Sequence, residues 1–164
     1  MAAAPVLGLS IAGCQASASP SSQSQGNEGG GSYEVIHLHG ETTQSKRIEN
    51  GDHATGVGNQ VLITEKLVRD GNKDGFSATR CTQVGGSLNP TPEKPNTQLC
   101  SGVYSLGNGQ ITWQNTLAVT SQGIPAPWKT AITGGTGTYA NARGYVLVNG
   151  AARDYTVYLV RTSS

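Results

Sequence analysis

The sequence predicts an all-β domain, specifically an eight-stranded antiparallel up-and-down β-barrel. The 164-residue chain contains 23 Gly but only one Phe and one Met, and it is rich in Thr and Val. Such a composition favours short strands and many turns over helices. In addition, eight short segments with strand character are separated by turn-forming residues at a regular spacing. Eight such strands fit a closed barrel, which leaves no exposed edge and can hold one small ligand.

Four strands are predicted in the first half of the domain: Tyr33–Glu41, Gln60–Arg69, Phe76–Val84 and Gln98–Leu106. The first alternates, with Tyr33, Val35, His37 and His39 on one face and Glu34, Ile36 and Leu38 on the other. The polar stretch from Thr42 to Gly58 is predicted to be irregular. A strong turn signal, Asp70 to Gly75, ends the second strand, and three prolines keep the loop from Gly85 to Asn96 outside the sheet.

The other four predicted strands are Gln110–Val119, Trp128–Thr133, Tyr145–Val148 and Asp154–Arg161. Gly107-Asn108-Gly109 predicts a hairpin turn before the first of them, and Asn149-Gly150 predicts another before the last. The stretch from Thr120 to Pro127 reads as a loop. Every predicted strand is therefore bounded by turn-forming or irregular sequence.

A glycine-rich segment, Gly134 to Gly144, separates the sixth and seventh predicted strands. Three glycines within four residues predict positive φ angles or a close approach of the backbone to another group. The segment lacks the complete pattern of a phosphate-binding loop or a dinucleotide-binding turn, and the residues after Gly144 are strand formers. It is predicted to be a barrel corner without chemistry of its own.

The same segment reads GGTG-x-Y-x-x-A-x-G, which resembles the signature of the dirigent and allene oxide cyclase family of β-barrels. The resemblance extends from near Gly56 to Leu159, with weaker support at Cys81, at Tyr104 and in Tyr155 to Tyr158. It implies a barrel whose lumen folds a reactive substrate without a cofactor. Catalysis of this kind lowers the entropy cost of reaching the reactive conformation and needs few catalytic groups, so it is not expected to produce a recognisable sequence motif. Bacterial members include cyclases of polyketide products, some of which catalyse [4+2] cycloadditions, and members often form dimers or trimers.

The N-terminal segment resembles a bacterial lipoprotein signal. A short apolar run ends in Ile11-Ala12-Gly13-Cys14, in which Cys14 would receive the lipid, although no basic residue precedes the run. The run is too short to span a bilayer, and a disordered tail is the alternative interpretation. The predicted organisation is a signal peptide over residues 1–13, a Ser/Gln/Gly-rich tether over 14–32 and the barrel over 33–164. An exported protein is expected, either lipid-anchored at the cell surface or secreted.

Two cysteines, Cys81 and Cys100, lie in consecutive predicted strands. In an oxidising compartment such a pair is more often a disulfide than a metal site or a nucleophile, and two buried free thiols are the alternative. The net charge of +1 and the pI near 7.7, without a Lys/Arg cluster, argue against a nucleic-acid partner.

Polar and aromatic residues on the predicted strands are candidates for the barrel lumen. They are Tyr33, His37, His39, Glu65, Arg80, Tyr104, Trp113, Asn115 and Tyr158. His37 and His39 share a face, but a metal site would need Glu41 or the distant His53 as further ligands, so no metal is predicted. A histidine in the lumen could act as an acid or base. No residue is assigned a catalytic role from the sequence alone.

Two main functions are therefore expected. The first is a cyclase or isomerase that folds a hydrophobic polyene or polyketide-type substrate in the lumen. The second is a non-catalytic carrier of a lipophilic small molecule at the cell surface, similar to a lipocalin. Two or more convergent polar groups in the lumen would favour catalysis, and a uniformly apolar lumen would favour carriage. A protein-interaction module that uses the proline-rich loops is a third, weaker interpretation.

Overall fold

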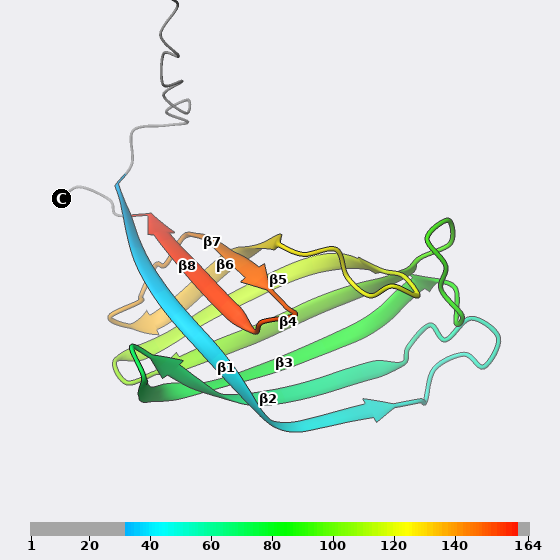
Figure 1. Ribbon diagram of the computed structural model, residues 1–164, viewed down its shortest axis with the longest axis horizontal. Coiled ribbons are helices and arrows are strands. Elements are labelled where there is room, and N and C mark those ends of the chain that lie inside the picture. The colour runs from blue at the N-terminus through cyan, green and yellow to red at the C-terminus, as the bar shows by residue number, and fades with distance from the viewer. Residues whose placement is uncertain (1–31, 161–164) are drawn as a thin grey trace, which may run out of the picture. The chain divides into compact units, whose positions relative to one another are not determined.

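The computed structural model describes residues 32–160, and its strands form one closed antiparallel barrel (Figure 1). Neighbouring strands in the sequence pair with each other, and the first pairs with the last. The strands are β1 (Tyr33–Ile48), β2 (Gln60–Arg69), β3 (Asn72–Gly86), β4 (Asn96–Leu106), β5 (Gly109–Val119), β6 (Trp128–Gly137), β7 (Gly144–Asn149) and β8 (Asp154–Val160). The predicted fold class, an eight-stranded up-and-down barrel, is confirmed.

Strand β1 closes the barrel and is longer than its sequence predicts. Residues Tyr33 to His39 pair with β8, and residues His39 to Ile48 pair with β2. The prediction that Thr42 to Gly58 is irregular is therefore wrong as far as Ile48. The register shifts between Thr42 and Gln44, so Thr43 forms a bulge. This polar segment remains a strand because its backbone pairs with the apolar strand β2, although its side chains are exposed.

The glycine-rich segment is also more regular than predicted. Strand β6 continues to Gly137, and the turn to β7 begins only at Thr138. Gly137 has a φ angle of +62°, and a side chain on Gly135 would lie 2.3 Å from the carbonyl oxygen of Tyr139. The two features predicted from these glycines, a positive φ angle and a close approach of the backbone to another group, are therefore both present. Tyr139 and Ala142 of the turn pack against the barrel core.

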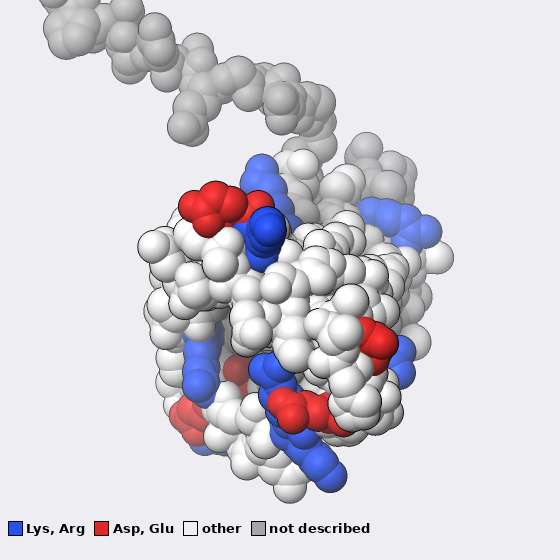
Figure 2. Space-filling view, turned by 90° about the vertical axis from the view of Figure 1, so that its right-hand side faces the viewer, with Lys and Arg blue, Asp and Glu red and all other residues white. Residues whose placement is uncertain are grey.

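The barrel is filled at one end and hollow toward the other. Buried aliphatic side chains from seven of the strands fill the end that carries the β2–β3, β4–β5 and β6–β7 turns. They are Ile36, Leu38, Leu67, Leu106, Ile111, Ile132, Val146, Val157 and Leu159. The longer connections, 49–59, 87–95 and 120–127, lie at the opposite end (Figure 1). Figure 2 looks onto that opposite end, where charged side chains of both signs are scattered without a large patch of one sign.

Cys81 and Cys100 form a disulfide across β3 and β4, where they are direct partners in the strand register. The predicted pairing is confirmed, and the bond is consistent with an exported protein. The signal peptide, Cys14 and nearly all of the tether lie outside the described residues. Within residues 32–160, no helix is long and apolar enough to cross a membrane.

Removing this disulfide should destabilise the barrel. The bond closes a loop with a sequence separation of 19 residues, for which the loss of loop-closure entropy predicts about 3 kcal/mol. Urea unfolding of the double variant Cys81→Ser/Cys100→Ser should therefore give a free energy of unfolding lower by about that amount. An unchanged unfolding midpoint would contradict this expectation. It would mean that residual pairing of β3 with β4 restricts this loop in the unfolded chain even without the disulfide.

Candidate functional site

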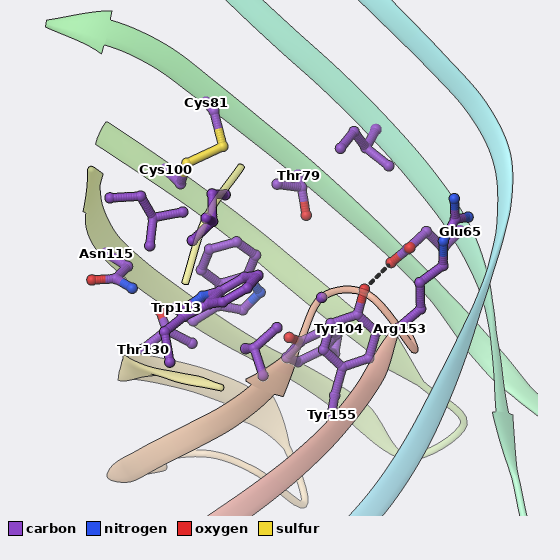
Figure 3. A pocket seen from close by; sticks show the side chains of 16 residues that line it. Glu65, Thr79, Cys81, Cys100, Tyr104, Trp113, Asn115, Thr130, Arg153 and Tyr155 are labelled. Carbon is purple, nitrogen blue, oxygen red and sulfur yellow. Dashed lines mark hydrogen bonds between the residues drawn. A yellow bond between two sulfur atoms is a disulfide. The ribbon is translucent and has the colours of Figure 1, made fainter. Parts of the chain in front are cut away.

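The hollow half of the barrel encloses a cavity of about 270 Å³ (Figure 3). Its wall comes from inward-facing residues of β2 to β8, the loop after β5 and the turn between β7 and β8. The lining residues are Ile63, Glu65, Thr79, Cys81, Cys100, Tyr104, Trp113, Asn115, Leu117, Ile124, Trp128, Thr130, Val148, Gly150, Arg153 and Tyr155. Most of these side chains are apolar or aromatic, and the charged members are Glu65 and Arg153.

Glu65 is the acidic group of this cavity, and it is almost fully buried, with 6% of its surface exposed. Its Oε2 atom accepts a hydrogen bond from the hydroxyl of Ser77 at 2.8 Å and another from the hydroxyl of Tyr155 at 2.7 Å (Figure 3). Among residues 32–160, no hydrogen bond to Oε1 is found. One carboxylate oxygen is thus held in place by two donors, and the other is left for a ligand.

Gly40 on β1 makes room for this arrangement. A Cβ atom at this position would lie 2.9 Å from the Tyr155 ring and 3.0 Å from the carboxyl group of Glu65. The backbone N–H of Gly40 also donates a 2.9 Å hydrogen bond to the carbonyl oxygen of Arg153, which ties β1 to the turn before β8. A side chain at this position would force the Tyr155 ring or the Glu65 carboxyl group to shift.

The substitution Gly40→Ala should disturb the Glu65–Tyr155 hydrogen bond and cost about 1–3 kcal/mol of stability through overpacking. Gly85→Ala is the matched control, since a Cβ atom there meets nothing within 4 Å. Thermal unfolding of both variants measures the difference. Equal stability of the two variants would contradict the tight packing around Glu65.

Two tyrosines of the cavity are held in their neutral form. Burial raises the pKa of Tyr104 well above 10.0, and the nearby Tyr155 and Glu65 add to this effect. Burial, followed by the hydrogen bond to Glu65, raises the pKa of Tyr155. Tyr155 therefore stays a hydrogen-bond donor to Glu65 throughout the neutral pH range.

These shifts predict a loss of stability at alkaline pH. The unfolded chain releases these phenolic protons near pH 10.0, whereas the folded barrel retains them, so the contribution to stability is complete below that pH and falls above it. Of the 6 tyrosines in the chain, Tyr104 and Tyr155 should be the last to ionise in an absorbance titration of the folded protein. The variant Tyr155→Phe should remove one late-titrating group. Early ionisation of all tyrosines in the folded state would contradict the burial.

Aromatic rings form much of the cavity wall. The ring centroid of Tyr104 lies 5.5 Å from that of Tyr155 and 6.1 Å from that of Trp113. Trp113 lies over Gly102, where a Cβ atom would come within 2.5 Å of the indole ring. The indole N–H of Trp113 is buried without a hydrogen-bond partner among the described residues. Such a surface suits a flat, mostly apolar ligand.

The structure divides the sequence-predicted candidates between the two faces of the barrel wall. Glu65, Tyr104, Trp113 and Asn115 line the cavity. Five others lie on the outer face instead: Tyr33, His37, His39, Arg80 and Tyr158. The burial patterns of three strands correct their proposed place in the lumen, because the buried residues alternate with them: Ile36 and Leu38 on β1, Ser77 and Gln83 on β3, and Val157 and Leu159 on β8. The alternation along β1 is as predicted, but the aliphatic face fills the barrel.

The outer-face histidines make contacts of their own. Nδ1 of His39 lies 2.8 Å from the carboxylate of Asp154, and Nδ1 of His37 lies 3.4 Å from the Thr156 hydroxyl. Glu41, considered as a metal ligand with them, instead forms an ion pair with Lys66 at 2.9 Å. No group of three or more metal-ligating side chains is found among the described residues.

Sequence reasoning missed Ser77, Arg153, Tyr155 and Trp128 as members of the site. The inward position of Tyr155 could have been found, because the apolar residues Val157 and Leu159 follow it at the strand period of two. Ser77 and Arg153 carry no such signal. Their place depends on strand register and on the turn between β7 and β8.

The likeness of this chain to known proteins is one of structure. No model of a protein family and no curated protein sequence matches this chain. Among solved structures, the chain is similar to pyocyanin demethylase, with 27% sequence identity and a TM-score of 0.63. The match covers 79% of this chain and 100% of that one. The likeness indicates a barrel fold of an enzyme-like or ligand-binding type.

Proposed function

We propose that this protein is an enzyme of the isomerase or cyclase type, which binds a compact unsaturated molecule in the barrel lumen and transfers a proton through Glu65. The observation that carries this proposal is the buried carboxylate of Glu65, held through Oε2 by Ser77 and Tyr155 while it lines the cavity. The lumen thus contains the convergent polar groups expected of a catalytic barrel rather than the uniformly apolar wall expected of a carrier.

Each part of the cavity contributes to this chemistry. The free oxygen of Glu65 can accept a proton from a bound ligand and return it to another atom, which is general acid–base catalysis. The hydroxyls of Ser77 and Tyr155 fix the orientation of the carboxylate, so that less reorganisation is needed during the reaction. Tyr104, Trp113 and Trp128 provide the flat apolar surfaces that hold the ligand.

The size of the cavity restricts the substrate. A volume of about 270 Å³ is slightly below the range of ordinary ligand pockets, which are about 300–1,000 Å³. This supports a compact aromatic or polyunsaturated molecule over a large polyketide chain. Within the cyclase class, a proton-assisted isomerisation or cyclisation makes use of Glu65, whereas a [4+2] cycloaddition would need only the shape of the wall.

Removal of a substituent from a small aromatic compound is a second candidate reaction. It is favoured by the likeness to pyocyanin demethylase, which extends over the whole of that chain. By its name, that enzyme demethylates pyocyanin. A hydrolytic demethylation would balance with water as the co-reactant, since the bond to the methyl group breaks, the water oxygen takes up the methyl group as methanol, and Glu65 transfers the proton of that water to the ligand. The same Glu65 variant therefore tests both reactions.

Incubation with a panel of compact aromatic and polyunsaturated compounds, pyocyanin included, tests the proposal. Products are identified by liquid chromatography and mass spectrometry. We expect at least one compound to be converted to an isomer, a cyclised product or a demethylated product by the wild-type protein. Stoichiometric binding in the lumen without conversion of any compound would contradict the enzyme proposal and establish the carrier function. Native mass spectrometry of the same samples measures that binding.

We further propose, from the sequence, a family relation, a membrane anchor and an oligomeric state for this protein. They are the relation to the dirigent and allene oxide cyclase family, the lipid anchor at Cys14 as the sole attachment to a membrane, and the assembly into a homo-oligomer. The motif from Gly134 to Gly144 supports the first. The lipoprotein-like sequence before Cys14 supports the second. The frequent assembly of the resembled family into dimers or trimers supports the third. A barrel at the cell surface would meet small molecules from outside the cell.

A further inference from the structure

We infer that Arg153 binds a negatively charged oxygen of the lumen ligand, so that the substrates are compact unsaturated molecules that carry a carboxylate, enolate or phenolate group. This inference rests on the proposed function and specifies its substrate class. Arg153 belongs to the turn between β7 and β8 and was not among the residues singled out from the sequence. Its role follows from three features of its position.

The first feature is that Arg153 is fixed to β1 at two points. Its carbonyl oxygen accepts the 2.9 Å hydrogen bond from the N–H of Gly40, and its guanidinium group donates a hydrogen bond to the hydroxyl of Thr42. Its backbone has a φ angle of +57°, which is uncommon for a residue other than glycine. Arg153 is exposed to solvent, but these two contacts hold it beside the cavity that it lines.

The second feature is that its charge has no acidic partner within the part of the chain that the structure describes. The ion pairs found among residues 32–160 do not include Arg153. Its neighbour Asp154 pairs instead with His39 on the outer face of the barrel, at 2.8 Å. A guanidinium group presents several N–H donors in a plane and binds carboxylate and similar oxygens through two of them. The donors that Thr42 does not use are therefore available to a ligand.

The third feature is the place of this charge relative to Glu65. Arg153 is the cationic residue and Glu65 the acidic residue of the cavity lining, and Figure 3 shows both beside Tyr155 at the same side of the cavity. A ligand whose anionic oxygen contacts Arg153 would therefore lie on the same side of the cavity as the carboxyl group of Glu65. The anionic group would then be the feature that orients the substrate for proton transfer.

The inference is tested with two flat aromatic probes of similar shape. 2-Naphthoate is negatively charged and 2-naphthamide is uncharged, and the binding of each is measured by calorimetry. Three variants are compared with the wild-type protein. Arg153→Gln removes the charge, and Arg153→Lys retains it without the planar donor group. Arg80→Gln removes the same charge from the outer face, where Arg80 is exposed.

We expect the wild-type protein to bind 2-naphthoate at least about tenfold more tightly than 2-naphthamide, a difference of about 1.4 kcal/mol. Arg153→Gln should abolish this preference, Arg153→Lys should retain part of it, and Arg80→Gln should leave it unchanged. Equal affinity for the two probes, or a preference that survives in Arg153→Gln, would overturn the role of Arg153 while leaving the lumen as the binding site. Failure of both probes to bind would count against the proposed function itself, and the inference would fall with it.

Discussion

Replacing Glu65 by glutamine should lower the rate of conversion of any lumen substrate by about 10²–10⁴-fold, the usual contribution of a positioned acid or base. Glutamine has the same shape, and its amide oxygen can still accept the hydrogen bonds from Ser77 and Tyr155. The barrel should therefore keep its fold and its affinity for the ligand. The rate alone should fall, because the amide group cannot take up a proton at neutral pH.

Glu41→Gln is the matched control for this variant. Glu41 lies on the exposed face of β1, where it pairs with Lys66, and such a surface ion pair is worth at most about 1 kcal/mol. Both variants are assayed for product formation with a compound converted by the wild-type protein, and both are checked by thermal unfolding. A Glu65→Gln variant as active as Glu41→Gln would remove Glu65 from the mechanism.

The second large effect is expected at the filled end of the barrel. Leu67 lies two residues after Glu65 on β2 and is completely buried among the aliphatic side chains of the core. Truncation to alanine should lower the free energy of unfolding by about 2–5 kcal/mol, since it removes buried apolar surface and leaves a void beside the site. Urea unfolding at equilibrium measures this loss.

Leu99→Ala provides the comparison, because the same side chain on the outer face of β4 is 39% exposed. Its truncation should cost much less than that of Leu67. Similar losses for the two variants would mean that the filled end of the barrel is not the main source of its stability.

The barrel itself could be predicted because its signals are local. Turn-forming residues such as Asp70-Gly71 and Gly107-Asn108 mark the hairpins, and the strand period of two is visible in β1 and β8. The disulfide followed from the same reading, since Cys81 and Cys100 lie on consecutive strands. What could not be seen was that polar residues after Thr42 continue β1, because their strand conformation depends on pairing with β2.

The site was only partly predictable, for a different physical reason. Glu65 and Tyr104 share their strand faces with apolar neighbours, so their inward position follows from the local pattern. In β1, either face could line a lumen by its residue types. Whether the histidines or the aliphatic residues point inward depends on the side chains of the other strands, against which the inward face must pack. The hydrogen bonds of Glu65 join β2, β3 and β8, and sequence spacing does not reveal such a meeting.

The central claim, that the cavity inside the barrel is the ligand site, is tested most directly by filling it. Thr79 lines the cavity from β3, and Thr79→Phe would place a ring inside it, whereas Thr116→Phe places the same ring on the exposed face of β5. Binding of the compound panel is measured by calorimetry for both variants. We predict that compounds bound one to one by the wild-type protein keep their affinity in Thr116→Phe and lose it in Thr79→Phe. Undiminished binding to a folded Thr79→Phe variant would contradict the claim and place the ligand outside the lumen.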